Sequence, residues 1–306
     1  GTSTQLVSPV TKQWDRELIR LLGYPEEMFL PLKMPGTVVG DLTGAVAEEV
    51  GFSCKVVLCG SHDTASAVMA VPRAEGDALY ISSGTWSLMG VELPEADCRP
   101  VSRQANFTNE GGYDYRFRYL KNIMGLWMIQ SIRHELGDSY SFAQLCDMAM
   151  AAGDFPSRVK ANDACFLAPK NMTEEIRAYC GRTGQKIPET TGELACVVYR
   201  SLADCYGETV GEIEANTGKE YGAVSIIGGG ANAAYLNQLT ANATGKTVYA
   251  GPTEATAIGN IMAQIIGAGE LNGLAQARKC VYESFEIKEY RPQPIHSYQK
   301  GSFQNA

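Results

Sequence analysis

Short apolar runs and longer helical stripes alternate along this chain, and the first clear unit lies between residues 56 and 70. Residues 56–59 (VVLC) are four apolar positions in a row, which predicts a buried strand. Gly60 lets the backbone turn, and residues 64–70 are rich in small side chains that suit close helix packing. We therefore expect a strand, a turn and a helix, with His62 and Asp63 at the strand exit.

Further strands are expected on both sides of polar turns. Two apolar runs flank the tetrad SSGT, so residues 77–91 predict a β-hairpin whose turn carries three hydroxyl groups. Residues 115–120 alternate aromatic and basic side chains, which predicts a half-buried strand that ends before Asn122. A buried strand is predicted at 223–227, a short strand at 248–250 and a further strand-like segment at 282–290.

Helical periodicity is strongest at residues 193–216, where the apolar stripe indicates a core helix that Gly218 ends. Small side chains recur in the helix expected to begin at Pro252 or Thr253, which predicts a closely packed neighbour. The remaining helices are expected at 14–22, 42–50, 123–136, 141–151, 173–180 and 231–243, with mostly loop at 24–41 and 92–112. Strands that alternate with helices indicate an α/β fold.

The start of the chain is unlike the start of a complete domain. A polar tail, one helix whose apolar face holds Trp14, Leu18, Leu21 and Leu22, and a long Pro- and Gly-containing loop come before the first strand. We therefore expect two parts, with residues 1–53 as a remnant and linker and residues 54–306 as the main domain.

Composition narrows the function classes. The 306 residues are 45% hydrophobic and 20% charged, as in an ordinary globular protein. A formal net charge of -8 argues against nonspecific nucleic-acid binding, and no apolar run approaches the roughly 18 residues of a membrane span. The nine cysteines include no CxxC pair, which predicts mostly buried thiols in a reducing compartment, the cytoplasm. Pairing of Cys180 with Cys196 stays open.

Asp63 is the first candidate for chemistry. A carboxylate at the carboxyl end of a strand, just before a helix, is a common catalytic placement in open α/β sheets. The alternative is that Asp63 merely caps the helix, which Asp often does. His62 has the same two possibilities, as a ligand or as a packed core histidine.

Two turns are candidates for binding phosphate or nucleotide. The hairpin turn at 82–85 presents backbone N–H groups and hydroxyls that can hold a phosphate, although a plain polar turn fits the same letters. The run Gly228-Gly229-Gly230 joins a strand to a helix and lets a ligand approach the backbone closely. A base, a phosphate-binding turn and a nucleotide platform are the parts that phosphoryl transfer needs.

Other motifs are excluded or weak. The triplet at 245–247 (GKT) resembles the end of a Walker A loop, but Thr240 stands where a glycine is required and a strand follows. Neither GxSxG nor HExxH occurs, and the three histidines, His62, His134 and His296, form no credible metal cluster. We therefore assign no metal ligand in this chain.

Longer motifs make the chain similar to the FGGY carbohydrate kinases. The matching stretches, in chain order, are TSTQLV (2–7), GSHDTASAV (60–68), YISSGTWSLMG (80–90), NFTNEGG (106–112), LKNIMGLW (120–127), IIGGGANAAYLNQL (226–239) and AGPTEATAIGNI (250–261). Several motifs of six or more residues match, in order, over nearly the whole chain. Residues 82–90 and 120–127 favour the branch that acts on L-rhamnulose over xylulose, glycerol or gluconate relatives.

The resemblance implies a ribonuclease H-like (actin-like ATPase) fold, with a mixed sheet flanked by helices. It implies two lobes with the active site between them, so that residues 1–53 would end the N-terminal sugar-binding lobe and residues 54–306 would form the ATP-binding lobe. The implied reaction is transfer of the ATP γ-phosphate to the 1-hydroxyl of L-rhamnulose, with Mg²⁺. Because most of the first lobe is missing, the isolated chain is expected to be inactive.

The resemblance also implies site residues. Asp63 would be the general base, and the sugar would contact His62, Asp63, Thr64 and Asn122. The nucleotide would contact Thr85, Gln130, Gly228, Gly229 and Gly230.

Three alternatives stay open. The chain resembles other ketose kinases, such as an L-fuculokinase. As an isolated fragment it fits a nucleotide-binding module without catalysis. A weaker alternative is a sugar-phosphate hydrolase with Asp63 as its nucleophile.

Overall fold

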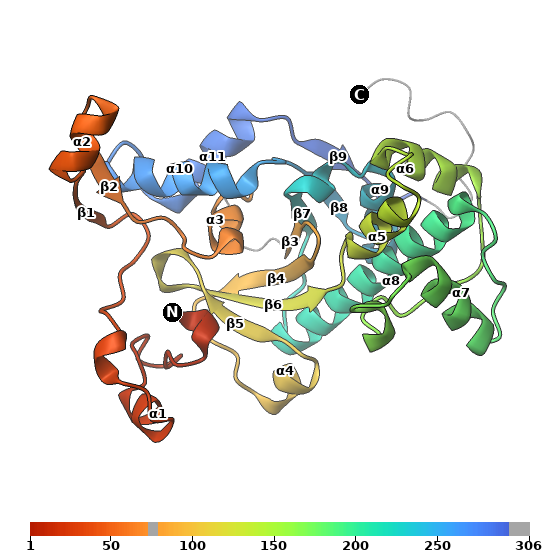
Figure 1. The fold of residues 1–306 in the computed structure, drawn as a ribbon, viewed down its shortest axis with the longest axis horizontal. Helices are drawn as coiled ribbons and strands as arrows, with labels where there is room; N and C mark the ends of the chain where they lie inside the picture. Colours follow the sequence, from red (N-terminus) through yellow and green to blue (C-terminus); the bar gives the residue numbers. More distant parts are fainter. Residues whose placement is uncertain (73–78, 294–306) are drawn as a thin grey trace.

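Figure 1 shows the computed structural model, in which residues 1–72 and 79–293 are described. A seven-stranded mixed sheet with the order β5-β6-β4-β3-β7-β8-β9 forms the centre, and β1 pairs with β2 in a separate two-stranded sheet. The strands are β1 (Val38–Asp41), β2 (Lys55–Val57), β3 (Leu79–Ser83), β4 (Ser87–Leu93), β5 (Thr108–Gly111), β6 (Phe117–Ile123), β7 (Ala223–Ile227), β8 (Thr247–Ala250) and β9 (Lys288–Tyr290).

Helices cover both faces of the large sheet. The α-helices are α1 (Arg16–Leu21), α2 (Gly44–Val50), α3 (Asp63–Met69), α4 (Pro100–Gln104), α5 (Trp127–Glu135), α6 (Phe142–Ala151), α7 (Met172–Arg182), α8 (Thr191–Thr217), α9 (Ala234–Thr244), α10 (Ala255–Gly267) and α11 (Leu274–Ser284). Short 3₁₀ helices are η1 (Thr2–Thr4), η2 (Glu26–Met28), η3 (Tyr113–Tyr115), η4 (Ala164–Phe166) and η5 (Gly229–Asn232).

The two-residue period of β3 explains why there are two cores. Leu79 and Ile81 join one apolar cluster with residues of α5 to α9, and Tyr80 between them joins a second cluster with residues of α3, α10 and α11. Figure 1 shows these two helix groups on opposite sides of the sheet. The result is a three-layer α/β/α arrangement, which confirms the predicted mixed sheet flanked by helices.

The long helix α8 confirms the prediction for residues 193–216. A capping box begins it, in which the side chains of Thr190 and Glu193 each bond the other residue's backbone N–H, and Gly218 ends it with a φ of 68°. The rejected GKT triplet is structural, because Gly245 ends α9 and Lys246 forms an ion pair with Glu214 at 2.8 Å.

The buried strand predicted at 56–59 is wrong. The strand there, β2, covers only Lys55–Val57, pairs with β1 and is largely exposed, with Val56 38% exposed. Together with α2, this small sheet stands away from the large sheet (Figure 1), so the apolar run covers no core.

The strand predicted at 115–120 is displaced. The strand β6 runs to Ile123, includes Asn122 and is mostly buried, because β4 and β5 pair with it on both sides. Consequently the helix expected from 123 begins only at Trp127. The hairpin is confirmed as β3 and β4, while positions 77 and 78 of the prediction lie outside the described residues.

Several boundaries also differ from the prediction. The loops expected at 92–112 and 24–41 contain α4 with β5, and η2 with β1, respectively. The last two glycines of the triglycine and the two residues after them form η5, and α9 begins only at Ala234. The helix α10 begins at Ala255 rather than at Pro252 or Thr253. Of the strand expected at 282–290, residues 282–284 are the end of α11, and only the last three residues form a strand, β9. In α1 the buried side chain is Ile19, whereas Leu21 of the predicted face is 81% exposed.

The cysteines are all free, so Cys180 and Cys196 do not form a disulfide. Only three of the nine cysteines are buried, namely Cys146, Cys180 and Cys196, so the prediction of mostly buried thiols is wrong. Among residues 1–72 and 79–293, we find no helix with both the length and the apolar character needed to traverse a bilayer.

Candidate functional site

Three loops meet at one edge of the large sheet. The strands β3, β7 and β8 are parallel neighbours, so their carboxyl ends lie at the same edge. The turn at 84–86 follows β3, the triglycine follows β7, and Gly251-Pro252 follows β8. The backbone N–H of Gly228 donates to the carbonyl of Pro252 at 3.1 Å, which ties two of these loops together.

The turn after β3 is held in one conformation by the segment that precedes α5. The carbonyls of Gly84 and Thr85 accept bonds from the N–H groups of Leu126 and Trp127 at 3.2 and 2.9 Å. Gly125 allows this approach, because its φ is +60° and a Cβ there would lie 2.5 Å from the backbone nitrogen of Ser87. The Thr85 side chain remains exposed, as a phosphate-binding hydroxyl requires.

The three glycines of the second loop have different surroundings. Gly228 has a φ of +82°, and a Cβ on Gly230 would lie 2.0 Å from Oγ of the buried Ser83. Gly229 has nothing within 4 Å of such a Cβ. The absent side chain at Gly230 therefore makes room for Ser83 in the protein interior, whereas the space beside Gly229 is open.

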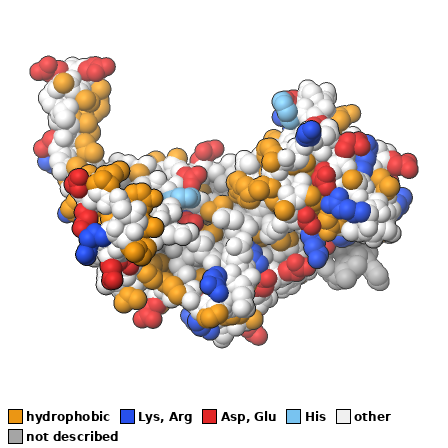
Figure 2. All heavy atoms as spheres, turned by 60° about the horizontal axis from the view of Figure 1, so that its bottom comes forward, with side chains coloured by type: hydrophobic (Ala, Val, Ile, Leu, Met, Phe, Trp, Pro, Cys, Tyr) orange, Lys and Arg blue, Asp and Glu red, His pale blue; other side chains and the backbone are white. Residues whose placement is uncertain are grey.

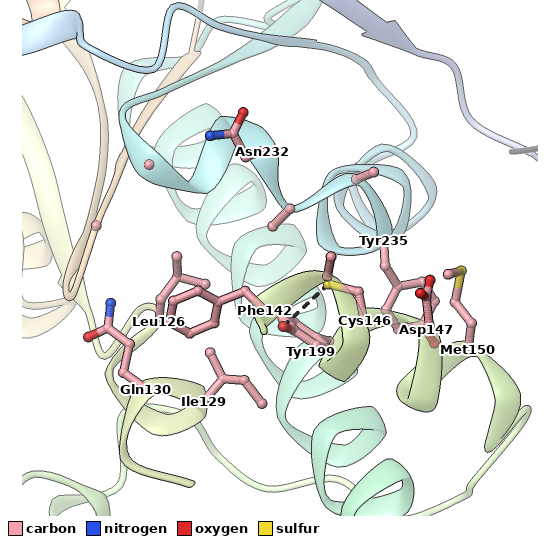
Figure 3. A pocket seen from close by; sticks show the side chains of 15 residues that line it. Leu126, Ile129, Gln130, Phe142, Cys146, Asp147, Met150, Tyr199, Asn232 and Tyr235 are labelled. Carbon is pink, nitrogen blue, oxygen red and sulfur yellow. Dashed lines mark hydrogen bonds between the residues drawn. The ribbon is translucent and has the colours of Figure 1, made fainter. Parts of the chain in front are cut away.

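A cavity of about 530 Å³ opens beside these loops, and Gly84, Gln130 and Gly229 all line it. Figure 3 shows Gln130 at one end, Asn232 above, and apolar side chains from α5, α6 and α9 across the middle. Its walls are Leu126, Ile129, Phe142, Ala143, Cys146, Met150, Tyr199, Ala233, Ala234 and Tyr235, with Asp147 as the carboxylate in the lining. A mostly apolar cavity with a few polar groups is typical of a small-molecule site.

Two neutral groups form part of the cavity wall. The Cys146 thiol donates to the Tyr199 hydroxyl with 3.4 Å between sulfur and oxygen (Figure 3). Burial raises the pKa of the Cys146 thiol and the pKa of Tyr199, so both stay uncharged near neutral pH. This part of the cavity therefore suits a planar apolar group better than an anion.

Asp63 is the first residue of α3, and its side chain is 77% exposed. Its Oδ1 accepts a bond from the backbone N–H of Thr64 at 2.7 Å and lies 3.0 Å from Nδ1 of His62. The N-cap of α3 is His62, whose Nδ1 also accepts from Thr64 N–H, at 3.2 Å. Local bonding of the kind expected for capping is thus present, and most of the Asp63 carboxylate still faces outward.

The segment that begins α10 contacts both Asp63 and Asn232 of the cavity lining. The Thr256 hydroxyl donates to the Asp63 carbonyl at 3.4 Å, and the Thr253 hydroxyl lies 3.3 Å from Oδ1 of Asn232. Both threonines belong to the segment that begins α10. Asp63 itself lines neither this cavity nor the second one.

The second cavity, of about 560 Å³, lies between the N-terminal residues and the β5–β6 edge, and His62 is part of its lining. Thr2 closes one side, where its Oγ1 accepts from the Gly111 N–H at 2.9 Å. Figure 2 shows a face of the molecule that is hollowed between two raised ends. The other predicted contacts line neither cavity. Thr64 is buried and Asn122 is exposed on β6, while Thr85, Gly228 and Gly230 lie in the two loops beside the first cavity.

Sequence reasoning missed some residues of the first cavity. Asn232 lies two residues after Gly230, so its closeness to the triglycine was a usable signal. Phe142 and Asp147 lie on α6, whose periodicity predicted a helix but gave no sign of a ligand. Among the described residues there is no group of three or more His, Cys, Asp or Glu side chains that would hold a metal ion; His296 lies outside them.

Comparison with solved structures identifies the fold. A ligand-bound xylulose kinase from Lactobacillus acidophilus superposes with a TM-score of 0.73 over 94% of this chain and 58% of that chain, at 16% identity. Plasmodium falciparum glycerol kinase with ADP gives a TM-score of 0.70 over 94% and 57%, at 12% identity. At such low identities the similarity concerns the fold, and it confirms the predicted actin-like architecture.

Sequence relatives are more similar. A rhamnulokinase from Halalkalibacterium halodurans is 49% identical over 290 residues, which are 95% of this chain and 62% of that protein. A rhamnulokinase from Bacillus subtilis is 44% identical over 295 residues, 96% of this chain and 61% of that protein. The chain thus spans about three fifths of the length of these relatives.

The family profile decides the assignment. The FGGY family of carbohydrate kinases, C-terminal domain, matches residues 79–268, which is more than half of the chain and includes both the hairpin turn and the triglycine. The chain belongs to the FGGY family of carbohydrate kinases.

Proposed function

We propose that this chain is the ATP-binding lobe of a sugar kinase that transfers the γ-phosphate of ATP to the 1-hydroxyl of L-rhamnulose. The observation that carries the proposal is the cavity of about 530 Å³ in which Gly84, Gln130 and Gly229 meet. The rhamnulokinase names of the relatives support the choice of sugar. Because the chain spans about three fifths of their length, the activity is proposed for a protein that also has an N-terminal lobe.

The division into lobes is part of the proposal. Residues 1–53 would complete the N-terminal sugar-binding lobe and its linker, and residues 54–306 would bind the nucleotide. The pairing of β1 with β2 crosses this boundary, so the small sheet would join the two parts. His62, Thr64 and Asn122 would contact the sugar from this side.

The nucleotide would lie with its base in the apolar part of the cavity, near Phe142 and Tyr235, and its phosphates toward Thr85. Backbone N–H groups of the turn at 84–86 and of the triglycine segment would hold the phosphates. Gln130, at one end of the cavity (Figure 3), would contact the nucleotide there. The exposed hydroxyl of Thr85 and the open space at Gly229 support this orientation.

Asp63 would act as the general base. Its carboxylate takes the proton of the sugar hydroxyl as that oxygen forms a bond to the γ-phosphorus, and the bond from that phosphorus to the β,γ-bridging oxygen breaks, so ADP leaves. The exposed carboxylate at the start of α3 supports this role, because a substrate hydroxyl can reach it.

Magnesium would come with the nucleotide. Mg²⁺ usually keeps several waters and binds one or two carboxylates together with substrate phosphates, so it needs no cage of protein ligands. When bound, the ion would neutralise phosphate charge. Free thiols throughout support a place in the reducing cytoplasm.

A pair of substitutions on α6 tests the nucleotide site. Ala143 is exposed and lines the cavity, whereas Ala151 is exposed on the same helix and outside the lining. We expect A143W to reduce ADP affinity at least about tenfold in calorimetry, because the indole occupies the space of the base. A151W is the matched control, and equal affinities in the two variants would contradict the site.

Substitution of Asp63 tests the chemistry. In the protein with both lobes, Asp63→Asn is expected to keep ADP affinity and to lower kcat by about 10²–10⁴-fold. A coupled assay of ADP release with L-rhamnulose, L-fuculose and xylulose as substrates identifies the sugar. Full turnover in the Asn variant would remove Asp63 from this role.

A further inference from the structure

The helix that carries Asp63 is short and depends on its neighbours for its orientation. It has seven residues, about 10 Å in length, and no strand of the large sheet leads directly into it. A rotation or tilt of so short a helix would move its first residue, Asp63, relative to the sugar. The contacts along α3 therefore decide where the carboxylate lies.

The first half of α3 rests on α10. The Thr256 hydroxyl bonds the Asp63 carbonyl, and a Cβ on Gly259 would lie 1.7 Å from the Ser66 carbonyl oxygen, so the two backbones are in direct contact. Apolar side chains of the two helices also share one core cluster, so this contact fixes the distance between the helices. The bonds at the carboxyl end of α3 then decide how the helix is held at its other end.

Arg278 of α11 holds the other end. Its Nη2 donates to the Val68 carbonyl at 2.8 Å, and its Nε donates to the Met69 carbonyl at 3.3 Å. Its charge sits at the negative end of the helix dipole, where a cation is favourable. Arg278 is only 4% exposed, so bulk water does not compete for these bonds.

The same guanidinium is anchored to the sheet. Its Nη2 lies 2.6 Å from Oε2 of Glu92 on β4, and both side chains are less than 10% exposed. The planar guanidinium has five donors in a fixed arrangement, so it can bond the carboxylate and both carbonyls at once. Arg278 thus connects the end of α3 to the sheet whose β3–β4 turn carries Thr85.

We propose that Arg278 is a positioning residue for Asp63, which it orients through the end of α3. The proposal rests on the proposed function only for its catalytic consequence, because the effect on α3 is measurable without turnover. Nothing in the contacts of Arg278 reaches the cavity lined by Gln130 and Tyr235, which lies on the opposite face of the sheet.

Hydrogen exchange on this chain tests the structural half. The N–H groups of Ala65 and Ser66 both bond the His62 carbonyl and report on the first turn of α3. In Arg278→Met we expect these amides to exchange at least about tenfold faster, as loss of a charge-assisted bond would produce, with ADP affinity unchanged. Arg278→Lys, which keeps one charged donor, should recover part of the protection.

Arg158 provides the matched control. It also bonds two backbone carbonyls, those of Phe155 and Ser157, and a carboxylate, that of Asp204, but it touches no part of α3. Arg158→Met should leave the exchange of residues 65 and 66 unchanged. Equal protection of α3 in the Met variants at 278 and 158, or a general rise in exchange over β7 and α8 in R278M, would overturn the proposal. If R278M does not fold, R278K and Glu92→Gln provide the same comparison.

Kinetics in the protein with both lobes tests the catalytic half. A displacement of Asp63 by about 1 Å is expected to lower kcat by up to about 10²-fold, with the KM for ATP unchanged. If Asp63→Asn is inactive while R278M keeps its kcat, the positioning role fails and the proposed function stands. If Asp63→Asn is fully active, the general-base assignment fails, and the exchange result still decides whether Arg278 orders α3.

Discussion

At the scale of single residues, Gly229 and Gly230 are neighbours, but substitution of one should affect ADP binding and substitution of the other should affect stability. A Cβ on Gly230 would overlap the buried Ser83, so Gly230→Ala is expected to destabilise the fold by about 1–3 kcal/mol. A Cβ on Gly229 meets nothing, so Gly229→Ala should keep the stability but weaken ADP binding about tenfold or more.

Urea unfolding and calorimetry on both variants separate these effects, and each variant serves as the control for the other. Unchanged ADP affinity in Gly229→Ala would show that the nucleotide does not pass close to this backbone. A stable Gly230→Ala would show that the β3 end and the triglycine move apart easily.

Asp97 is expected to contribute to the acid sensitivity of the fold. Both its oxygens bond the Arg99 guanidinium, at 2.9 and 2.6 Å, and this hydrogen bonding lowers the pKa of the carboxyl from 3.8 to about 2. Because the folded pKa is the lower one, the stabilisation is complete above about pH 4 and disappears as the pH falls toward 2. Urea unfolding of wild type and Asp97→Asn should therefore converge over this interval, and a constant difference would contradict the assignment.

At the scale of elements, the α3–α10 contact depends on one glycine. Gly259→Ala would place a methyl group 1.7 Å from the Ser66 carbonyl oxygen, so α3 must shift, and we expect a loss of about 2–3 kcal/mol. Gly211 on α8 is the matched control, because it is also helical and has no atom within 4 Å of an added Cβ. Gly211→Ala should stabilise by about 0.5–1 kcal/mol. Equal effects in thermal unfolding would contradict the close approach.

Elements with a strong period or clear end signals were predictable from the sequence. The α8 helix has both. The small residues of α10 also predicted a close partner, and that partner is α3. Residues 56–59 show what failed, because an apolar run identifies a surface that avoids water but not which part of the protein covers it. The same limit applies to the cavity: Gly84, Gln130 and Gly229 come together only through strand order, which local patterns do not contain.

At the scale of the whole molecule, apolar exposure is unevenly distributed. Of the large hydrophobic side chains that are exposed in the described residues, twelve lie within residues 1–57, which are about a fifth of the described chain, and nine lie elsewhere. Figure 2 shows apolar side chains gathered toward the left end, where the N-terminal elements lie. Such a concentration is typical of a surface that another part of a protein covers, which agrees with the proposed N-terminal lobe.

The proposed division of labour predicts which ligand each part recognises. Residues 1–306 alone contain the complete cavity near the triglycine, so they should bind ADP with an affinity within a few-fold of the two-lobed protein, and ADP at about 100 times its Kd should stabilise them by about 2.7 kcal/mol. The ketose should bind only to the two-lobed protein, because in the proposed function His62 and Asp63 would form only one side of its site. Calorimetry with ADP and with L-rhamnulose on both proteins checks this, with A143W as the control that weakens ADP binding in each. Sugar-dependent ADP release by residues 1–306 alone would contradict the division, and failure of these residues to bind ADP would contradict the assignment of the cavity.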